Sequence, residues 1–202
     1  MDKENERHGT TTLGLKCKDG VILASESRAT MGNLIANKDT PKIFKIQDHI
    51  WMTTAGSVAD AQKLVRLMQV ETNLYQIERD HPIKVDSAVS LLSNVLHGNK
   101  YFPYWVQLLV GGYDSKPRLY SLDAVGSALE EKVVSTGSGS PFAYGLLEAD
   151  YKEDATIEEN LPVAAKAIKS ALERDAFSGN NIKLVAITKS GYRHVDPAGY
   201  LK

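Results

Sequence analysis

Hydrophobic and polar residues alternate near the beginning of the chain, which is the pattern of a β-strand. Leu13, Leu15 and Cys17 are separated by polar residues or glycine, and this spacing of two is typical of a half-buried strand. The turn-forming sequence KDG follows, and residues 21–26 then form a more apolar run. These residues therefore predict a two-stranded hairpin at the start of the fold.

We expect a second strand pair at residues 42–46 and 50–55. After it, the spacing of apolar residues changes from that of a strand to that of a helix. Apolar or small residues then recur in steps of three and four. Ser57, with Asp60 three positions later, resembles a helix N-cap. A second helical pattern follows and ends at Gly98. The chain is thus expected to pass from strands into two helices.

The same order repeats in the second half of the chain. Strands are expected at residues 105–113 and 118–123, two helical stretches follow, and strands at residues 183–189 and 192–195 close the chain. The second of these helices begins with a capping box at Thr156. Short hairpins favour antiparallel sheets, and paired helices after each block of strands suggest helical layers outside them. The pattern predicts one α+β domain.

Composition narrows the possible functions. The 202 residues are 43% hydrophobic and 24% charged, which fits one soluble domain with a substantial core. A net charge of −1 gives no electrostatic reason to expect a nucleic acid or membrane partner. No apolar run approaches the roughly 20 residues that cross a bilayer. A single cysteine, Cys17, excludes an internal disulfide, so we expect a cytoplasmic protein with a buried structural thiol.

Residues 1–9 (MDKENERHG) form a polar leader of mixed charge, unlike a secretory signal or a transit peptide. Three threonines follow it. A threonine hydroxyl is a weak nucleophile without a base, but an N-terminal threonine carries an α-amine with a pKa of about 7.7–8.0. Cleavage of the Gly9-Thr10 bond would create that amine, and glycine there tolerates a strained backbone. By alternation, Thr10 projects away from the apolar side of its strand.

Taken alone, the threonines could simply begin a strand after a tail that has no function, because threonine is a good strand former and N-terminal tails are often disordered. Other signatures of chemistry are absent. The sequence has no CxxC motif, and its five histidines lack metal-ligand spacing, so no metal site is expected. The glycine-rich residues 137–141 fit neither a P-loop, a dinucleotide fingerprint nor a nucleophile elbow. Taken alone, they predict a loop that caps the next helix.

Seven segments resemble a proteasome β subunit, and the catalytic subunit of the archaeal 20S core is the most similar type. In order they read GTTTLGL, ASESRAT, PKIFKI, TTAGSVADAQ, VQLLVGGYD, STGSGSPFAYGLLE and ERDAFSG. The resemblance implies a four-layer αββα sandwich of two antiparallel sheets flanked by helices, the fold of N-terminal-nucleophile hydrolases. It also implies that residues 1–9 are a propeptide removed by autocatalysis and that residues 10–202 form one catalytic domain. The short leader favours the archaeal over the bacterial form.

The resemblance implies roles for particular residues. Thr10 matches the nucleophile, and Gly9 with Thr10 forms the processing site. Lys42 matches the active-site lysine, whose charge would lower the pKa of the threonine amine. Glu26 matches the acidic residue that would hold Lys42. Without the resemblance, a solvated surface ion pair of little energetic value would be the simpler interpretation of these two charges.

Further positions match the surroundings of the nucleophile. Ser138, Asp175 and Ser178 match residues that orient the threonine and its amine. Gly56 matches the residue whose backbone N–H faces the developing oxyanion, a role for which glycine leaves the approach unobstructed. The positions that match the pocket for the residue before the cut are Ala29, Thr40, Phe44, Thr54 and Val58. Their mostly apolar character predicts cleavage after hydrophobic residues.

The sequence departs from the family pattern at one place near these residues. Ala176 and Phe177 lie between Asp175 and Ser178, where relatives often carry two small residues. Both polar positions are present, so the departure predicts a change in local packing and no loss of catalysis.

The family also implies partners and alternatives. The partners are other β subunits in a seven-membered ring, α-subunit rings, an ATP-driven unfoldase and unfolded polypeptide substrates, with no metal or organic cofactor. Alternatives are a non-catalytic ring scaffold of the same fold, the bacterial two-ring protease, and an amidase for small molecules. The joint presence of Gly9, Thr10, Glu26 and Lys42 favours a catalytic subunit over the scaffold.

Overall fold

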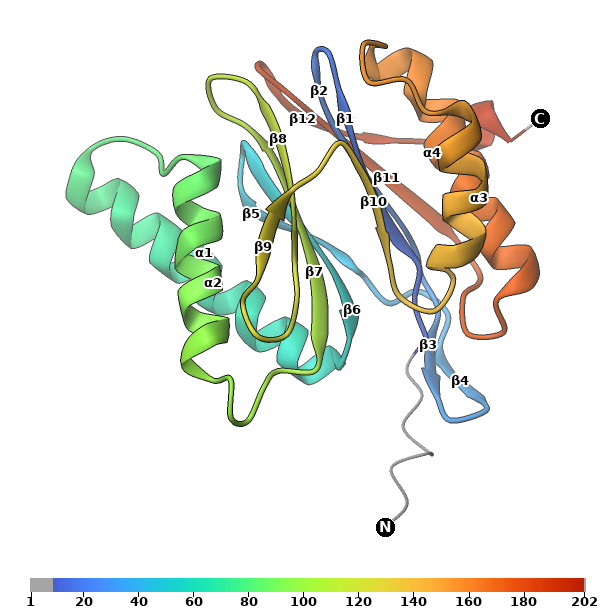
Figure 1. The fold of residues 1–202 in the computed structure, drawn as a ribbon, viewed down its shortest axis with the longest axis horizontal. Coiled ribbons are helices and arrows are strands. Elements are labelled where there is room, and N and C mark those ends of the chain that lie inside the picture. The colour runs from blue at the N-terminus through green and yellow to red at the C-terminus, as the bar shows by residue number, and fades with distance from the viewer. Residues whose placement is uncertain (1–8, 202) are drawn as a thin grey trace.

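The structure, a computed structural model, describes residues 9–201. Within this range two antiparallel sheets stack face to face, and helices cover the outer face of each sheet (Figure 1). In chain order the elements are β1 (Thr12–Cys17), β2 (Gly20–Glu26), β3 (Ala29–Met31), β4 (Leu34–Asn37), β5 (Ile43–Gln47), β6 (Ile50–Gly56), α1 (Val58–Arg79), α2 (Val85–Gly98), β7 (Val106–Tyr113), β8 (Pro117–Leu122), β9 (Ala128–Glu130), β10 (Val133–Thr136), α3 (Ser140–Asp150), α4 (Ile157–Arg174), β11 (Ile182–Thr188), β12 (Gly191–Val195) and the 3-10 helix η2 (Pro197–Tyr200). The predicted α+β, four-layer sandwich is confirmed.

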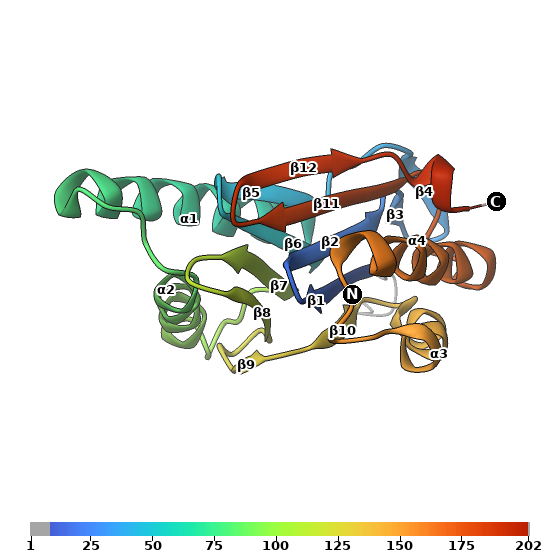
Figure 2. The same cartoon turned by 90° about the horizontal axis from the view of Figure 1, so that it is seen from above.

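Each of the two five-stranded sheets packs against its own helices, and β3 and β4 form a separate two-stranded sheet. The first sheet has the strand order β10-β1-β2-β11-β12 and packs against α3 and α4, with Leu15 and Ile168 in the apolar layer between them. The second has the order β5-β6-β7-β8-β9 and packs against α1 and α2 around Leu64 and Leu108. Seen from above, the two helix pairs lie at opposite ends of the molecule (Figure 2). A separate cluster that contains Leu109 fills the space between the sheets.

The first strand is buried on both faces, so the prediction of a half-buried strand was wrong. The side of β1 that alternation assigns to solvent faces the second sheet. There the Thr12 hydroxyl lies 2.9 Å from that of Thr53 and 2.7 Å from that of Thr136. Gly14 leaves room for the side chain of Leu119, because a Cβ on residue 14 would lie only 2.6 Å from Cδ1 of Leu119. The polar and small residues of β1 therefore face the second sheet and not solvent.

The helix starts agree with the sequence signals. The Ser57 hydroxyl accepts a hydrogen bond from the Asp60 amide at the start of α1. Thr156 and Glu159 form the complete capping box of α4. The sequence did not predict β3, β4, β9 and β10, because strands of three or four residues are too short to show a period. The omission of β10 matters for the site, because this strand pairs with β1 beside the threonines.

Cys17 is buried, and burial raises the pKa of its thiol to about 12, as expected of an inert structural cysteine. In the part of the chain that the structure describes, no helix combines the length and the apolar character that crossing a membrane requires.

Candidate active site

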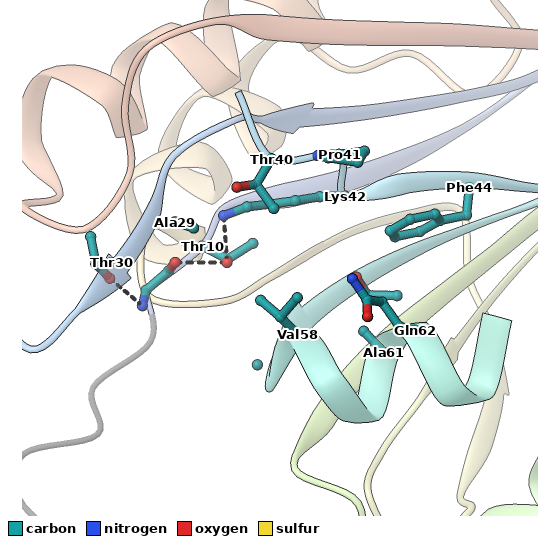
Figure 3. A pocket seen from close by; sticks show the side chains of 13 residues that line it. Thr10, Ala29, Thr30, Thr40, Pro41, Lys42, Phe44, Val58, Ala61 and Gln62 are labelled. Carbon is teal, nitrogen blue, oxygen red and sulfur yellow. Dashed lines mark hydrogen bonds between the residues drawn. The ribbon is translucent and has the colours of Figure 1, made fainter. Parts of the chain in front are cut away.

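Thr10 lies just before β1 and is buried at the junction of several elements. Its Oγ1 accepts a hydrogen bond of 2.7 Å from Nζ of Lys42 and donates one of 2.7 Å to the carbonyl oxygen of Gly9 (Figure 3). The backbone amide of Gly9 in turn donates to the Thr30 hydroxyl at 3.5 Å. The Thr10 hydroxyl is therefore in contact with both the Lys42 side chain and the carbonyl of the preceding residue.

Lys42 and Glu26 form a buried ion pair beside Thr10. Glu26 ends β2, Lys42 directly precedes β5, and the lysine Nζ contacts the Oε1 atom of the carboxylate. The side chains are only 7% and 0% exposed, respectively, so the alternative of a solvated surface pair is excluded. Burial lowers the pKa of the Lys42 ammonium, and the Glu26 carboxylate opposes this shift. A buried lysine with a lowered pKa is suited to accept a proton.

Glu26 is held in place by backbone amides as well as by Lys42. Its Oε2 atom accepts hydrogen bonds from the amides of Arg28 at 2.6 Å and Gly179 at 3.1 Å. Its Oε1 atom accepts a longer one, 3.4 Å, from the amide of Thr11. Because these donors belong to three separate segments of the chain, the carboxylate and the lysine it holds have little freedom to move.

Ser138, Asp175 and Ser178 meet beside the backbone nitrogen of Thr10. The Thr10 amide donates to the Ser138 hydroxyl at 3.2 Å, and that hydroxyl donates to Oδ2 of Asp175 at 2.6 Å. The Ser178 hydroxyl donates to the same carboxylate oxygen at 2.6 Å. The structure therefore brings all three predicted residues together, with Ser138 in direct contact with the nitrogen that cleavage would convert to an amine.

Two residues that contact the candidate site were missed by the sequence analysis. The Thr11 hydroxyl lies 2.6 Å from that of Ser178, and it links the start of β1 to the Asp175 group. Thr30 contacts the Gly9 amide and lines the pocket described next. The run of three threonines was the available signal for Thr11. Thr30 ends the matched segment ASESRAT and lies in β3, but nothing in the sequence indicates that it contacts Gly9.

A pocket opens beside Thr10 and Lys42, and the apolar side chains of Phe44 and Val58 project around it (Figure 3). The five residues predicted from the sequence all line it: Ala29, Thr40, Phe44, Thr54 and Val58. The other lining residues are Gly9, Thr10, Thr30, Pro41, Lys42, Gly56, Ala61 and Gln62. The lining thus combines apolar side chains with four threonines, one glutamine and Lys42.

A family model described as "Proteasome subunit" matches residues 6–187. The chain belongs to the proteasome subunit family. It is 51% identical over 199 residues to the "Proteasome subunit beta" of Methanosarcina barkeri (strain Fusaro / DSM 804), which covers 98% of this chain and 94% of that protein. It is 50% identical over 204 residues to that of Methanococcoides burtonii (strain DSM 6242 / NBRC 107633 / OCM 468 / ACE-M), covering 100% and 97%. The "Proteasome subunit beta" of Methanococcus maripaludis (strain C7 / ATCC BAA-1331) is 52% identical over 200 residues, covering 96% and 91%.

These comparisons confirm the resemblance drawn from the sequence motifs. The predicted enzyme class, a threonine endopeptidase of the N-terminal-nucleophile type, is that of proteasome β subunits. The roles of individual residues in this proteasome-family chain rest on the geometry above.

Gly56 lines the pocket, and its backbone conformation gives a further reason for glycine at this position. Its φ is +114°, a region that side-chain-bearing residues rarely adopt, and a Cβ would lie 2.2 Å from the carbonyl oxygen of Trp105. That carbonyl accepts the Ser57 amide at 2.8 Å, at the start of α1. Glycine therefore fixes how β6 enters the helix that carries Val58 into the pocket.

Replacing Gly56 with alanine should lower the free energy of unfolding by about 2 kcal/mol, because the new Cβ meets both an unfavourable φ and a backbone carbonyl. Gly98→Ala is the matched control, since a Cβ at Gly98 has no heavy atom within 4 Å. This control should be neutral or stabilising by less than about 1 kcal/mol. Denaturant unfolding of both variants tests the prediction, and equal stabilities would contradict it.

Proposed function

We propose that this chain is a catalytic β subunit of a proteasome core, a threonine endopeptidase that activates itself by cleaving its own Gly9-Thr10 bond. One observation carries the proposal: a buried lysine with a lowered pKa lies 2.7 Å from the Thr10 hydroxyl, which contacts the carbonyl of the bond to be cut. Residues 1–8 of the proposed propeptide lie outside the described residues. A non-catalytic scaffold has no need of such an arrangement.

Self-cleavage begins with the proton on the Thr10 hydroxyl. Neutral Lys42 accepts this proton, and Oγ1 forms a bond to the carbonyl carbon of Gly9. The bond between that carbon and the Thr10 nitrogen then breaks, and the nitrogen leaves with a proton as a free amine. Water hydrolyses the resulting ester, which releases the Gly9 carboxylate and restores the Thr10 hydroxyl.

Peptide hydrolysis repeats this chemistry on another chain. The hydroxyl proton passes to the new α-amine or to Lys42, and Oγ1 attacks the peptide carbonyl carbon. The peptide C–N bond then breaks, the leaving amine takes up that proton, and an acyl-ester remains on Thr10. The amide of Gly56 is proposed to stabilise the oxyanion. Ser138, already 3.2 Å from the Thr10 nitrogen and hydrogen-bonded to Asp175, would hold the amine in place. Water then releases the product and regenerates Thr10.

The proposed partners follow from the family. The chain is expected to assemble with other β subunits and with α subunits into stacked seven-membered rings, and to receive unfolded polypeptides from an ATP-driven unfoldase. Its one cysteine is buried and has no second cysteine to pair with, which suits the cytoplasm.

An electrophilic peptide probe with a hydrophobic residue next to its reactive group tests the proposed nucleophile. After reaction with the assembled particle and digestion, mass spectrometry should place the adduct on Thr10, in a peptide that begins at this residue. An adduct on another residue, or hydrolysis that the probe does not inhibit, would contradict the assignment.

The rate of self-cleavage should rise with pH, because only neutral Lys42 can accept the hydroxyl proton. Burial lowers the pKa of this lysine, so its neutral form appears at lower pH than that of an exposed lysine. Loss of the leader can be followed by intact mass after precursor and α subunits are mixed at several pH values. Native gels would follow assembly in parallel. A self-cleavage rate that stays constant or falls as pH rises, while assembly is unchanged, would contradict this prediction.

Cleavage should occur mainly after hydrophobic residues, because Ala29, Phe44 and Val58 line the pocket and the charge of Lys42 is paired with Glu26. Profiling with a peptide library would measure this preference directly. Dominant cleavage after arginine or aspartate would show that the pocket does not receive the residue before the cut.

A further inference from the structure

Gly9 is packed against the side chain of Phe177. A Cβ placed on Gly9 would lie 1.7 Å from Cβ of Phe177, 2.6 Å from its Cγ and 2.8 Å from Oγ of Ser138. Ordinary contact begins near 3.4 Å, so the two residues would have to separate by about 1.7 Å to admit even an alanine. The first obstacle is a Cβ atom, which no side-chain rotation can move.

The backbone that carries Phe177 is held from several sides. Its amide donates to Oδ1 of Asp175 at 3.3 Å, and the carbonyl of Ala176 accepts a hydrogen bond from the Arg28 guanidinium at 3.3 Å. Two residues later, the Gly179 amide donates to the buried Glu26 carboxylate at 3.1 Å. A shift of Phe177 would disturb these contacts, so a side chain at residue 9 would be expected to displace residue 9 instead.

Displacing residue 9 would separate the reacting groups. With glycine at residue 9, the Gly9 carbonyl oxygen lies 2.7 Å from Oγ1 of Thr10. Intramolecular attack needs such closeness, and a misplacement of about 1 Å can lower a rate by about 10²-fold.

We propose that Phe177 is a specificity-determining residue for self-cleavage: its Cβ restricts residue 9 to glycine and so holds the scissile carbonyl against Thr10. This inference rests on the proposed self-cleavage. The selection of glycine at residue 9 is then distinct from the selection of substrate residues by the pocket. The three atoms nearest to a Cβ at residue 9 belong to Phe177 and Ser138. The apolar residues of the substrate pocket, including Phe44 and Val58, are a different wall.

The test compares the cost of Gly9→Ala in three backgrounds of the full chain: wild type, F177A and F177G. Each chain is assembled with α subunits, and loss of residues 1–9 is timed by intact mass. F177A keeps the obstructing Cβ and F177G removes it, so F177A is the matched control. Gly9→Ala should slow self-cleavage by about 10²-fold in wild type and F177A, and by at least about tenfold less in F177G.

An equal cost of Gly9→Ala in all three backgrounds would overturn the inference, and would indicate that glycine is required for backbone freedom. Failure of the proposed function looks different, because an active wild-type particle would then retain its leader. If F177G does not assemble, a structure of the Gly9→Ala particle decides the question. Residue 9 should be displaced in it, and an alanine whose carbonyl still contacts Oγ1 of Thr10 would refute the proposal, whether or not Phe177 has moved.

Discussion

Replacing Thr10 with alanine should abolish both self-cleavage and peptide hydrolysis. The same hydroxyl is in contact with the Gly9 carbonyl and with Lys42, so its removal leaves neither reaction with a nucleophile. Peptidase activity of the assembled particle should fall by at least about 10³-fold, because only binding and oxyanion stabilisation would remain. Intact mass should show the leader still attached.

Thr10→Ser is the matched control for this loss. It keeps the hydroxyl and, after cleavage, the α-amine, and removes only a methyl group, so both reactions should persist at a reduced rate. If the alanine variant lost its leader at the wild-type rate, another group or a separate protease would be responsible, and the role assigned to Thr10 would be wrong.

Replacing Lys42 with arginine should slow self-cleavage by about 10²-fold or more, the usual contribution of a positioned base. Arginine keeps the positive charge beside Glu26 but cannot give up its proton, so it cannot accept one from Thr10. Leader loss measured by intact mass tests this expectation. A Lys42→Arg chain processed at the wild-type rate would show that Lys42 serves only to balance Glu26.

Lys42→Met separates the electrostatic role of the lysine from its chemical role. It leaves the Glu26 carboxylate buried without its counter-charge, which should lower the free energy of unfolding by about 3–5 kcal/mol. Glu26→Gln in the same chain removes the unpaired charge and should recover part of that loss. Denaturant unfolding of both single variants and the double variant gives the coupling energy, and additive effects would contradict a buried ion pair.

Much of the fold could be predicted because its longer elements carry their own period and caps. The helices that begin after Ser57 and Thr156 were recognisable from N-cap chemistry and apolar spacing. The short strands were not, and the burial of β1 was misjudged, because threonine and glycine suggest an exposed face in isolation. Only the stacking of a second sheet turns that face into an interior contact.

The candidate site shows what sequence alone can and cannot supply. Glu26 and Lys42 are 16 residues apart, and spacing does not reveal that they form a buried pair beside Thr10. The resemblance to a family provided that expectation, and the geometry gives it a physical basis. The contact of Phe177 with Gly9 joins segments 168 residues apart, so no local pattern could have indicated it.

The central claim is that the working enzyme carries Thr10 as its first residue. The most direct measurement is the intact mass and N-terminal sequence of the β chain in an assembled particle that is hydrolysing peptides. We predict a chain that begins TTTLGL, with residues 1–9 removed. A particle that hydrolyses peptides at full rate while its β chains still begin at Met1 would contradict the account.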